Sequence, residues 1–455
     1  MTLPLELLWM LLLLAVIVVS FIILKRPIYE SMLTGFLILA VVMGQTKAIP
    51  ALLLKPSTNT LFYAIVAFLT LAFVFGETQV VNTIIEFMMS LVGRFKGGAG
   101  YVALTSSTFM SALSGTGPGN VAATGVFTIP AMIKTGFSPE LAATTEMSAS
   151  SLGPMIPPSG TILLAFGVLD AALPGTFNLS TFWLVVWGIG LWFILQRALL
   201  LFVLCRVEKV EAIPTEEIPS FRKTVREGWK ALLVPVIIFL PLLLDFLLKD
   251  TFFTARIGAE GAGALSSSVI QFTPGVAALY TLWISRDKIE GGLRLPVIVN
   301  LFKKGVKSVV PVAATIYFAY CISELFGQAH VGQTLEHTIA SLNLSGWQVA
   351  VFIPLFTMFL GMFLPGSSQI AIFGVGIVGA LMAVGVPPLL AAGILPAITG
   401  GLEGMTPPLA LCMYTAMGIS GSGMKETSRL ALIWVFAHLV TAVLILLNII
   451  PVPFL

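Results

Sequence analysis

Long apolar segments recur along the whole chain, and several are long enough to cross a lipid bilayer as a helix. A transmembrane helix needs about 20 mostly apolar residues. The clearest segments are residues 5–24, 59–76, 183–205, 231–248, 308–325 and 428–449. The sequence has no ten-residue pattern of alternating polar and apolar residues, which would indicate a membrane β-barrel. It therefore predicts an all-α polytopic membrane protein.

The shortage of charged residues supports this prediction. Only 10% of the 455 residues are charged, whereas 57% are hydrophobic. A soluble domain carries about 25% charged residues, so a globule of this size would lack the polar residues for its surface. Membrane topology explains the basic residues, and we expect no nucleic-acid partner. The 3 cysteines and 3 histidines show neither CxxC nor metal-ligand spacing.

The basic residues also predict how the chain is threaded. We place the N-terminus outside and treat residues 98–132 and 347–384 as re-entrant hairpins. Of the 24 basic residues, 4 then fall outside and the remaining 20 inside. The four outside are Lys47, Lys55, Lys249 and Arg256. This asymmetry follows the positive-inside rule. It predicts a multi-pass protein of a bacterial or archaeal inner (plasma) membrane, with both termini outside.

Two similar passages, one in each half of the chain, predict an internal repeat. Residues 136–143 and 385–392 share five identities in eight positions, including a GxxP motif. A tip rich in Gly, Ser or Pro precedes each passage, and a double proline follows it. The tips are residues 114–120 and 365–369, and the prolines are 157–158 and 407–408. The charge pattern places the tips on opposite sides, so the repeats have inverted topology, a common plan of secondary carriers.

Each tip is flanked by apolar stretches too short to span a membrane alone, so each repeat is expected to hold a re-entrant hairpin and a broken helix. A turn inside the membrane leaves backbone groups that lipid cannot pair, so it survives only against protein or a wet cavity. Freed carbonyls with Ser, Thr and Asn oxygens suit a monovalent cation, and half-helix N-termini suit an anion. Simple kinks with close helix packing are the alternative. Two matched sets at inverted positions favour a substrate or ion site.

Two carboxylates in these segments are candidate coupling residues. Glu146 lies between the first GxxP and its double proline, and Glu403 lies at the place that we expect to correspond in the second repeat. A carboxylate at the bilayer centre costs about 2.5–3.5 kcal/mol on insertion scales, so it normally faces the protein interior and has a role. Each could be an ion ligand, a proton site or an acceptor that holds the broken backbone. Asp245 and Glu324 lie nearer the ends of spans and are expected to be interfacial.

At these motifs the chain resembles the large membrane (permease) subunit of the tripartite ATP-independent periplasmic (TRAP) transporters, in the ion transporter superfamily. The resemblance covers nearly the whole chain, and its carrying passages are residues 111–125, 129–132, 153–159, 361–368 and 406–408. It implies an elevator mechanism, in which a transport domain holding both hairpins moves against a scaffold. It also implies sodium-coupled import of a small organic anion of the carboxylate class. The implied partners are a small four-helix membrane subunit, a periplasmic substrate-binding protein and membrane lipid.

The resemblance also nominates site residues in both repeats. The sodium nominees are Ser111, Ser114, Asn120, Gly153, Pro157, Gly366, Ser367, Gly401 and Thr406. The substrate nominees are Thr116, Asn120, Ser159, Ser368 and Gln369. The chain departs from dicarboxylate-type members at Pro365, where those members often carry an aspartate. The Leu-Pro-Gly-Ser form looks more like the branch that uses the other class of binding protein, which leaves open the substrate and the ligands of the second ion.

These observations divide the chain into five parts. The scaffold is assigned residues 1–97, with an interfacial arm at 77–93, and residues 181–345, with a cytoplasmic loop at 207–228. The transport domain is assigned residues 98–180 and 346–420, each holding a hairpin and a broken helix, and residues 421–455 form a C-terminal transmembrane helix.

Other functions are weighed against this one. A stand-alone ion-coupled carboxylate carrier or exchanger of the same superfamily would need no binding protein. An intramembrane enzyme is disfavoured because the chain has no HExxH, no paired aspartates at a membrane face and no Ser/His couple at motif spacing. A passive channel suits inverted re-entrant repeats less well than alternating access does. Sodium is the expected coupling ion, with a proton as the alternative, and we expect no covalent cofactor and no enzymatic activity.

Overall fold

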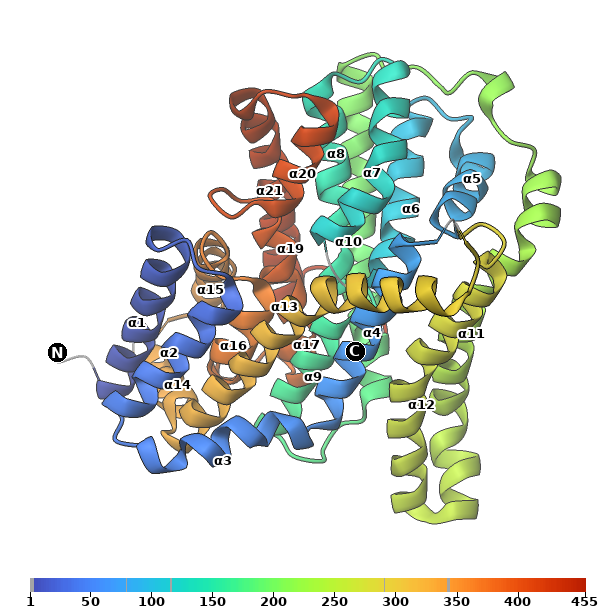
Figure 1. The fold of residues 1–455 in the computed structure, drawn as a ribbon. Helices are drawn as coiled ribbons and strands as arrows, with labels where there is room; N and C mark the ends of the chain where they lie inside the picture. Colours follow the sequence, from blue (N-terminus) through green and yellow to red (C-terminus); the bar gives the residue numbers. More distant parts are fainter. Residues whose placement is uncertain (1–3, 79, 115–116, 290, 342–343) are drawn as a thin grey trace.

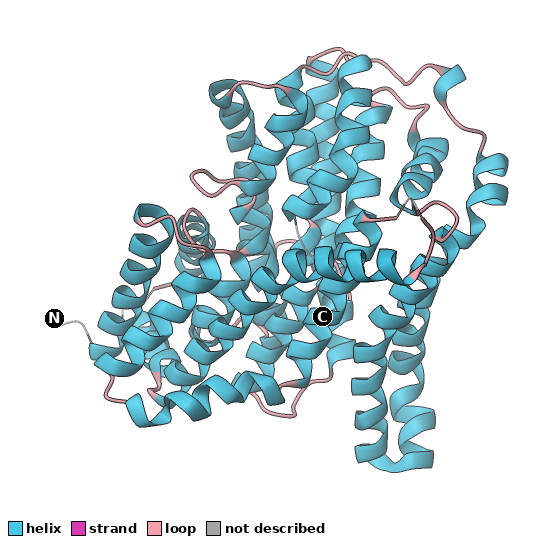
Figure 2. Cartoon of the chain, in the orientation of Figure 1, coloured by secondary structure: helices cyan, strands magenta, loops and turns pink. Residues whose placement is uncertain are grey.

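The computed structural model describes residues 4–78, 80–114, 117–289, 291–341 and 344–455, and all regular structure in these ranges is helical (Figure 2). Within them, 5 helices are long and apolar enough to cross a membrane, or up to 7 if each bent pair of helices counts as one span. The prediction of an all-α polytopic membrane protein is confirmed.

The first three helices of the chain lie at one side of the molecule, and the fourth runs through its middle (Figure 1). α1 (Leu5–Val18) continues through one π-helical turn, and α2 (Ile28–Val42) packs beside it. The short α3 (Ile49–Leu54) leads to α4 (Thr60–Gly76), where Asn59 caps the first turn by accepting the N–H of Leu61 at 2.9 Å.

The predicted arm at 77–93 forms a helix of its own, α5 (Val80–Val92). It packs against α6 (Gly98–Ser114) and α11 (Phe221–Leu248) through one apolar face, which buries Val81 and Ile84. Its position at a membrane interface stays a prediction.

The first repeat contains the predicted hairpin and broken helix. α6 and α7 (Gly117–Lys134) pack against each other, and α8 (Pro139–Ser150) begins after Ser138, which caps it by accepting the N–H of Leu141 at 3.2 Å. The chain then leaves the α-helix for the segment that holds the first double proline. It resumes as α9 (Gly160–Ala172), followed by α10 (Leu179–Val207).

The second repeat follows the same order. Its hairpin is α15 (Gly346–Gly361) and α16 (Gly366–Ala383). The first half of its broken helix is divided into α17 (Pro388–Gly393), α18 (Leu395–Ile398) and α19 (Gly400–Glu403), and α20 (Leu411–Ser420) and α21 (Met424–Leu446) follow the second double proline. In both repeats the bond between the two prolines is cis.

The two repeats interlock. α9 of the first repeat packs on α16 and α17 of the second, and α20 of the second packs on α7 and α8 of the first. α10 also packs on α21, so each repeat completes the surroundings of the other. Each broken helix therefore rests on the hairpin of the opposite repeat. The boundary between a transport domain and a scaffold stays a prediction.

The remaining helices are α11, α12 (Thr254–Ser285), α13 (Leu295–Gln328) and α14 (Val331–Ser341). α11 and α12 form a long hairpin that projects from the body (Figure 1). The loop predicted at 207–228 is shorter, because α11 begins at Phe221. The first turns of α11 are amphipathic, because Thr224 and Gly228 are buried and the charged residues are exposed. The last part of the predicted loop is therefore helical.

The two acidic residues expected near span ends differ from each other. Glu324 has a partly exposed side chain and lies 3.6 Å from Lys55, in keeping with an interfacial position. Asp245 is buried and accepts hydrogen bonds from Ser266 at 2.7 Å and Ser180 at 3.3 Å. α10 and α12 pack over this part of α11, and the interfacial position of Asp245 stays a prediction.

The interlocking of the repeats can be tested at Gly374 of α16. A Cβ at this position would lie 2.8 Å from the Val168 side chain of α9, whereas a Cβ at Gly418 of α20 would meet no atom within 4 Å. We expect Gly374→Leu to lower the free energy of unfolding by about 1–3 kcal/mol through overpacking. Gly418→Leu should have little effect. Thermal unfolding of the detergent-solubilised chain measures both, and equal melting temperatures would contradict the packing described.

Candidate functional site

A buried carboxylate joins the first hairpin to the first half of its broken helix. Glu146 lies in α8, and its side chain is 0% exposed. Its Oε1 accepts hydrogen bonds from Thr124 at 2.6 Å, Ser107 at 2.8 Å and Ser150 at 3.0 Å. Its Oε2 accepts one from Thr128 at 2.5 Å. Hydroxyl groups of α6, α7 and α8 thus converge on one carboxylate, which holds the three helices together.

Asn120, which is nominated for both sodium and substrate, lies beside this cluster. Its Nδ2 donates to the Ser107 carbonyl at 3.1 Å and to the Ser150 hydroxyl at 2.9 Å. Asn120, Thr124 and Thr128 follow one another at intervals of four, so they share one face of α7. This spacing is a signal that sequence reasoning missed, and it would have pointed to the hydroxyl groups around Glu146.

The second carboxylate meets the tip of the second hairpin. Oε2 of Glu403 accepts a short hydrogen bond from the backbone N–H of Gly366, the first residue of α16. A carboxylate is stabilised at a helix N-terminus, where N–H groups have no partner within the helix. The contact fits the predicted role of an acceptor that holds the broken backbone. Roles as an ion ligand or proton site stay predictions.

The two carboxylates are not at equivalent positions, which corrects one expectation. Glu146 lies within the continuous helix α8, whereas Glu403 is the last residue of the short α19. Gly153 precedes Pro157 by the same number of residues as Glu403 precedes Pro407, so Gly153 is the counterpart of Glu403 in the first repeat. The second half-helix is divided near Pro396, which lacks an N–H and so cannot continue the helical hydrogen bonds.

The nominees in the first break lie deep in the protein. Gly153 and Pro157 are buried in the segment between α8 and α9. Ser159 caps α9: its hydroxyl accepts the N–H of Thr161 at 3.2 Å and donates to the Pro154 carbonyl at 3.1 Å. The two breaks also face each other, because a Cβ on Gly400 would lie 2.8 Å from Pro154.

The nominees at the second tip include oxygens without partners. Ser368 and Gln369 are 0% exposed, and neither Ser368 Oγ nor Gln369 Oε1 has a hydrogen-bond partner among the described residues. The Gln369 amide nitrogen donates to the Leu364 carbonyl at 3.0 Å. Buried oxygens without partners cost free energy. These two are therefore candidate ligands for a cation or an organic molecule.

The other nominees of the second repeat are placed as follows. Ser367 is partly exposed beside Ser368. The Thr406 hydroxyl bonds the Leu402 carbonyl of its own chain segment at 3.0 Å. Gly401 is buried, and a Cβ there would lie 3.1 Å from the His438 ring. The structure thus brings Gly366 to Glu403 and Asn120 to Glu146.

Three nominees cannot be placed. Thr116 lies outside the described residues, and so do the side chains of Ser111 and Ser114, although both belong to α6. These nominations stay predictions.

The charge balance of the site is unusual. None of the ion pairs among the described residues includes Glu146, Glu403 or the buried Arg197 of α10. Both carboxylates therefore lack a cationic side-chain partner in the part of the chain that is described. In a membrane interior, such a carboxylate is a functional-site candidate.

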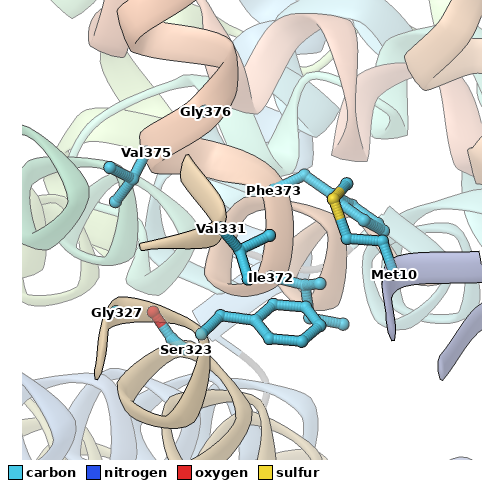
Figure 3. Close-up of a pocket in the computed structure, with 9 residues that line it drawn as sticks. Met10, Ser323, Gly327, Val331, Ile372, Phe373, Val375 and Gly376 are labelled. Carbon is cyan, nitrogen blue, oxygen red and sulfur yellow. The ribbon is translucent and has the colours of Figure 1, made fainter. Parts of the chain in front are cut away.

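A small cavity lies beside α16, on the side that faces α1, α13 and α14 (Figure 3). Its volume is ≈ 60 Å³, and its lining is mostly apolar, with Met10, Phe326 and Phe373 around it and Ser323 as a polar side chain. Sites for small organic molecules usually measure about 300–1,000 Å³. This cavity is therefore too small for an organic anion, and neither carboxylate lines it.

The sequence of this chain matches a known family of membrane proteins. Residues 7–452 match the family described as "Tripartite ATP-independent periplasmic transporter, DctM component". The chain is 25% identical over 374 residues to the C4-dicarboxylate TRAP transporter large permease protein DctM of Pseudomonas aeruginosa, covering 80% of this chain and 79% of that protein. It is 22% identical to the sialic acid TRAP transporter large permease protein SiaM of Vibrio cholerae, covering 82% and 80% of the two chains.

A solved structure shares the fold. The YdaH transporter of Alcanivorax borkumensis superposes with a TM-score of 0.59 at 15% identity, covering 89% of this chain and 88% of that one. At this identity the likeness concerns the fold alone.

The hydroxyl cluster predicts a specific stability effect. The Thr70 hydroxyl donates its proton to the carbonyl four residues earlier, whereas the single proton of the Thr128 hydroxyl has both such a carbonyl, at 3.1 Å, and Glu146 Oε2, at 2.5 Å, within reach. A hydrogen bond to a charged group contributes about 1.5–3 kcal/mol. We expect Thr128→Val to lower the free energy of unfolding by this amount and Thr70→Val to change it little. Denaturation of the purified chain measures both, and equal effects would show that Glu146 does not hold α7.

Proposed function

This chain belongs to the DctM-component family of the tripartite ATP-independent periplasmic transporters, and on this premise we propose that it carries a small organic anion into the cell in a sodium-coupled step. The chain is a large permease subunit and a multi-pass membrane protein. That it has no enzymatic activity is part of the proposal, supported by relatives that are permeases. Sodium coupling, the class of substrate and the orientation of the termini are parts of the proposal.

The observation that carries the proposal is a pair of carboxylates at the hairpins and breaks without a cationic side-chain partner among the described residues. Glu146 accepts four hydroxyl donors, and Glu403 accepts a backbone N–H. Hydroxyl, amide and carbonyl oxygens lie close by, including Ser368 Oγ and Gln369 Oε1. Carriers with broken helices bind sodium through such oxygens and through unwound backbone carbonyls. The donor set therefore fits a sodium ion, held at the first break by residues near Asn120 and at the second by the hairpin tip.

The same arrangement supports the organic anion as substrate. α7 and α16 begin at buried residues, Gly117 and Gly366, and α9 begins at the partly buried Gly160, whereas the first residue of α20 is exposed. Unpaired N–H groups at a helix N-terminus bind anionic groups. The relatives include permeases named for C4-dicarboxylate and for sialic acid. We infer a carboxylate of small size for this chain as well.

Alternating access by an elevator motion is part of the proposal. α9 and α20 cross from one repeat onto the hairpin of the other, so the hairpins and breaks can move as one body. The stationary side would be formed by α4, α13 and α14. Of these, α4 packs on α6 and α9, and α13 and α14 pack on α16. A small membrane subunit and a periplasmic binding protein are the proposed partners, and both termini are proposed to lie outside.

Uptake into proteoliposomes tests the coupling and the partners together. We expect a labelled carboxylate to accumulate only with an inward sodium gradient, the small subunit and the binding protein. Replacing sodium with choline should abolish accumulation. Equal uptake in choline without a proton gradient would refute ion coupling. Uptake by this chain alone would keep the fold and favour a stand-alone carrier or exchanger of the same superfamily.

The unpartnered hydroxyl of Ser368 gives a sharper test of the second ion site. Ser428 of α21 also has a buried hydroxyl without a partner among the described residues, but it lies outside the hairpins and breaks. Removing either hydroxyl breaks no described hydrogen bond, so neither Ser368→Ala nor Ser428→Ala should lower stability. We expect Ser368→Ala to raise the sodium concentration for half-maximal uptake roughly tenfold, the effect of losing about 1.4 kcal/mol of binding. Ser428→Ala is the control, and identical sodium dependence of the two variants would exclude Ser368 as a ligand.

A further inference from the structure

A buried arginine and a buried histidine connect the two helix breaks, although neither was singled out from the sequence. Arg197 lies in α10 and His438 in α21, and they are 1% and 0% exposed. Arg197 Nη2 and His438 Nδ1 lie 3.1 Å apart. A guanidinium group can only donate, so Nδ1 is the acceptor and the imidazole carries its proton on Nε2.

Each of these side chains also contacts a half-helix: Arg197 binds the end of the first, and His438 binds the second at α18, before its last piece α19. Arg197 Nε donates to the Ser148 carbonyl at 2.7 Å, and its Nη2 donates to the Ser151 hydroxyl at 2.9 Å, both at the C-terminal end of α8. His438 Nε2 donates to the Ala397 carbonyl in α18 at 3.0 Å. The last carbonyls of a helix have no partner within it. In carriers with broken helices such carbonyls hold the coupling cation, whereas here donors of the protein itself bind them.

Further contacts fix the position of the Arg197 guanidinium group. Nη1 donates to the Phe193 carbonyl at 3.3 Å and to Gln196 Oε1 at 3.1 Å. The Phe193 ring stacks on the His438 ring with centroids 4.3 Å apart. Arg197 forms no ion pair with an acid of the described chain. A charge held inside a membrane protein by carbonyls, a hydroxyl and an imidazole, rather than by an acid, calls for a role beyond neutralisation.

Hydrogen bonds on both sides extend this link to the hairpins. On the first side, Glu146 precedes Ser148 in α8 and binds the hydroxyls of the first hairpin. On the second side, Glu403 follows Ala397 and binds the N–H of Gly366 at the second hairpin tip. These hydrogen bonds and the backbone between them connect the two hairpins: α8 joins Glu146 to Ser148, and α18 and α19 join Ala397 to Glu403.

We propose that Arg197 and His438 are positioning residues that join the two breaks, so that a cation bound at one break favours binding at the other. The inference rests on the proposed sodium coupling. Carbonyls next to the end of α8 would hold an ion at the first break, and Arg197 and His438 would pass the ordering of that segment on to α18. Coupling between two sites of a protein is typically about 5- to 150-fold in affinity.

The test compares four variants in the three-component uptake system at varied sodium. His438→Phe keeps the ring and its stacking on Phe193 but has neither acceptor nor donor. His438→Gln supplies both again through its amide, and Arg197→Lys keeps the charge without the planar fork. Trp434→Phe is the matched control, because Trp434 is buried one turn earlier in α21 and its indole N–H has no partner among the described residues.

We expect wild type, Trp434→Phe and His438→Gln to show cooperative sodium dependence, with a Hill coefficient above 1. His438→Phe and Arg197→Lys should lower the coefficient toward 1 and raise the half-saturating sodium concentration at least fivefold. Hydrogen exchange of the purified chain, in sodium against choline, should show protection at residues 148–156 and 397–405 together in wild type but not in Arg197→Lys. If His438→Phe does not fold, Arg197→Lys carries the same comparison.

Unchanged cooperativity in both His438→Phe and Arg197→Lys would overturn the inference, and so would an equal loss in Trp434→Phe, which would indicate a general packing effect. A wild-type protein whose uptake ignores sodium would instead overturn the proposed coupling itself. The two failures are therefore distinguishable.

Discussion

Backbone N–H and C=O groups inside a bilayer have to be paired by the protein, and the organisation of this chain follows from that constraint. The hairpins and the two double-proline breaks interrupt the helices of a chain that is 57% hydrophobic. Each interruption leaves groups that lipid cannot bind. The protein meets this demand with polar side chains, and these are the places at which we propose that an ion and an anion bind.

The two repeats solve the problem with different residues. In the first, the carboxylate of Glu146 gathers hydroxyls from three helices and leaves the backbone of α8 continuous. In the second, Glu403 binds the backbone of the hairpin tip, and the half-helix is divided into three short pieces. Inverted topology therefore does not imply equal chemistry. If each repeat binds a cation, the two sites differ in ligands.

The family relation and the geometry of the breaks give different information about this chain. The family relation identifies a permease subunit. The geometry shows which polar groups meet at the hairpins and breaks, and it adds Arg197 and His438, which bind the end of α8 and the carbonyl of Ala397 in α18. A bundle in which the helices merely packed would have no need of this buried polar connection, because apolar packing is less costly in lipid.

The sequence by itself determined the fold class, the hairpins and the double-proline breaks, because apolar length, charge asymmetry and repeated Gly and Pro act locally. Hairpins expected at 98–132 and 347–384 occur as α6–α7 and α15–α16. Tertiary structure alone decided which polar groups meet. Glu146 finds hydroxyls from three helices, Asp245 is covered by neighbouring helices, and Arg197 reaches His438, 241 positions away. Sequence periodicity shows which face of a helix is polar, but the partner of that face depends on how the two repeats interlock.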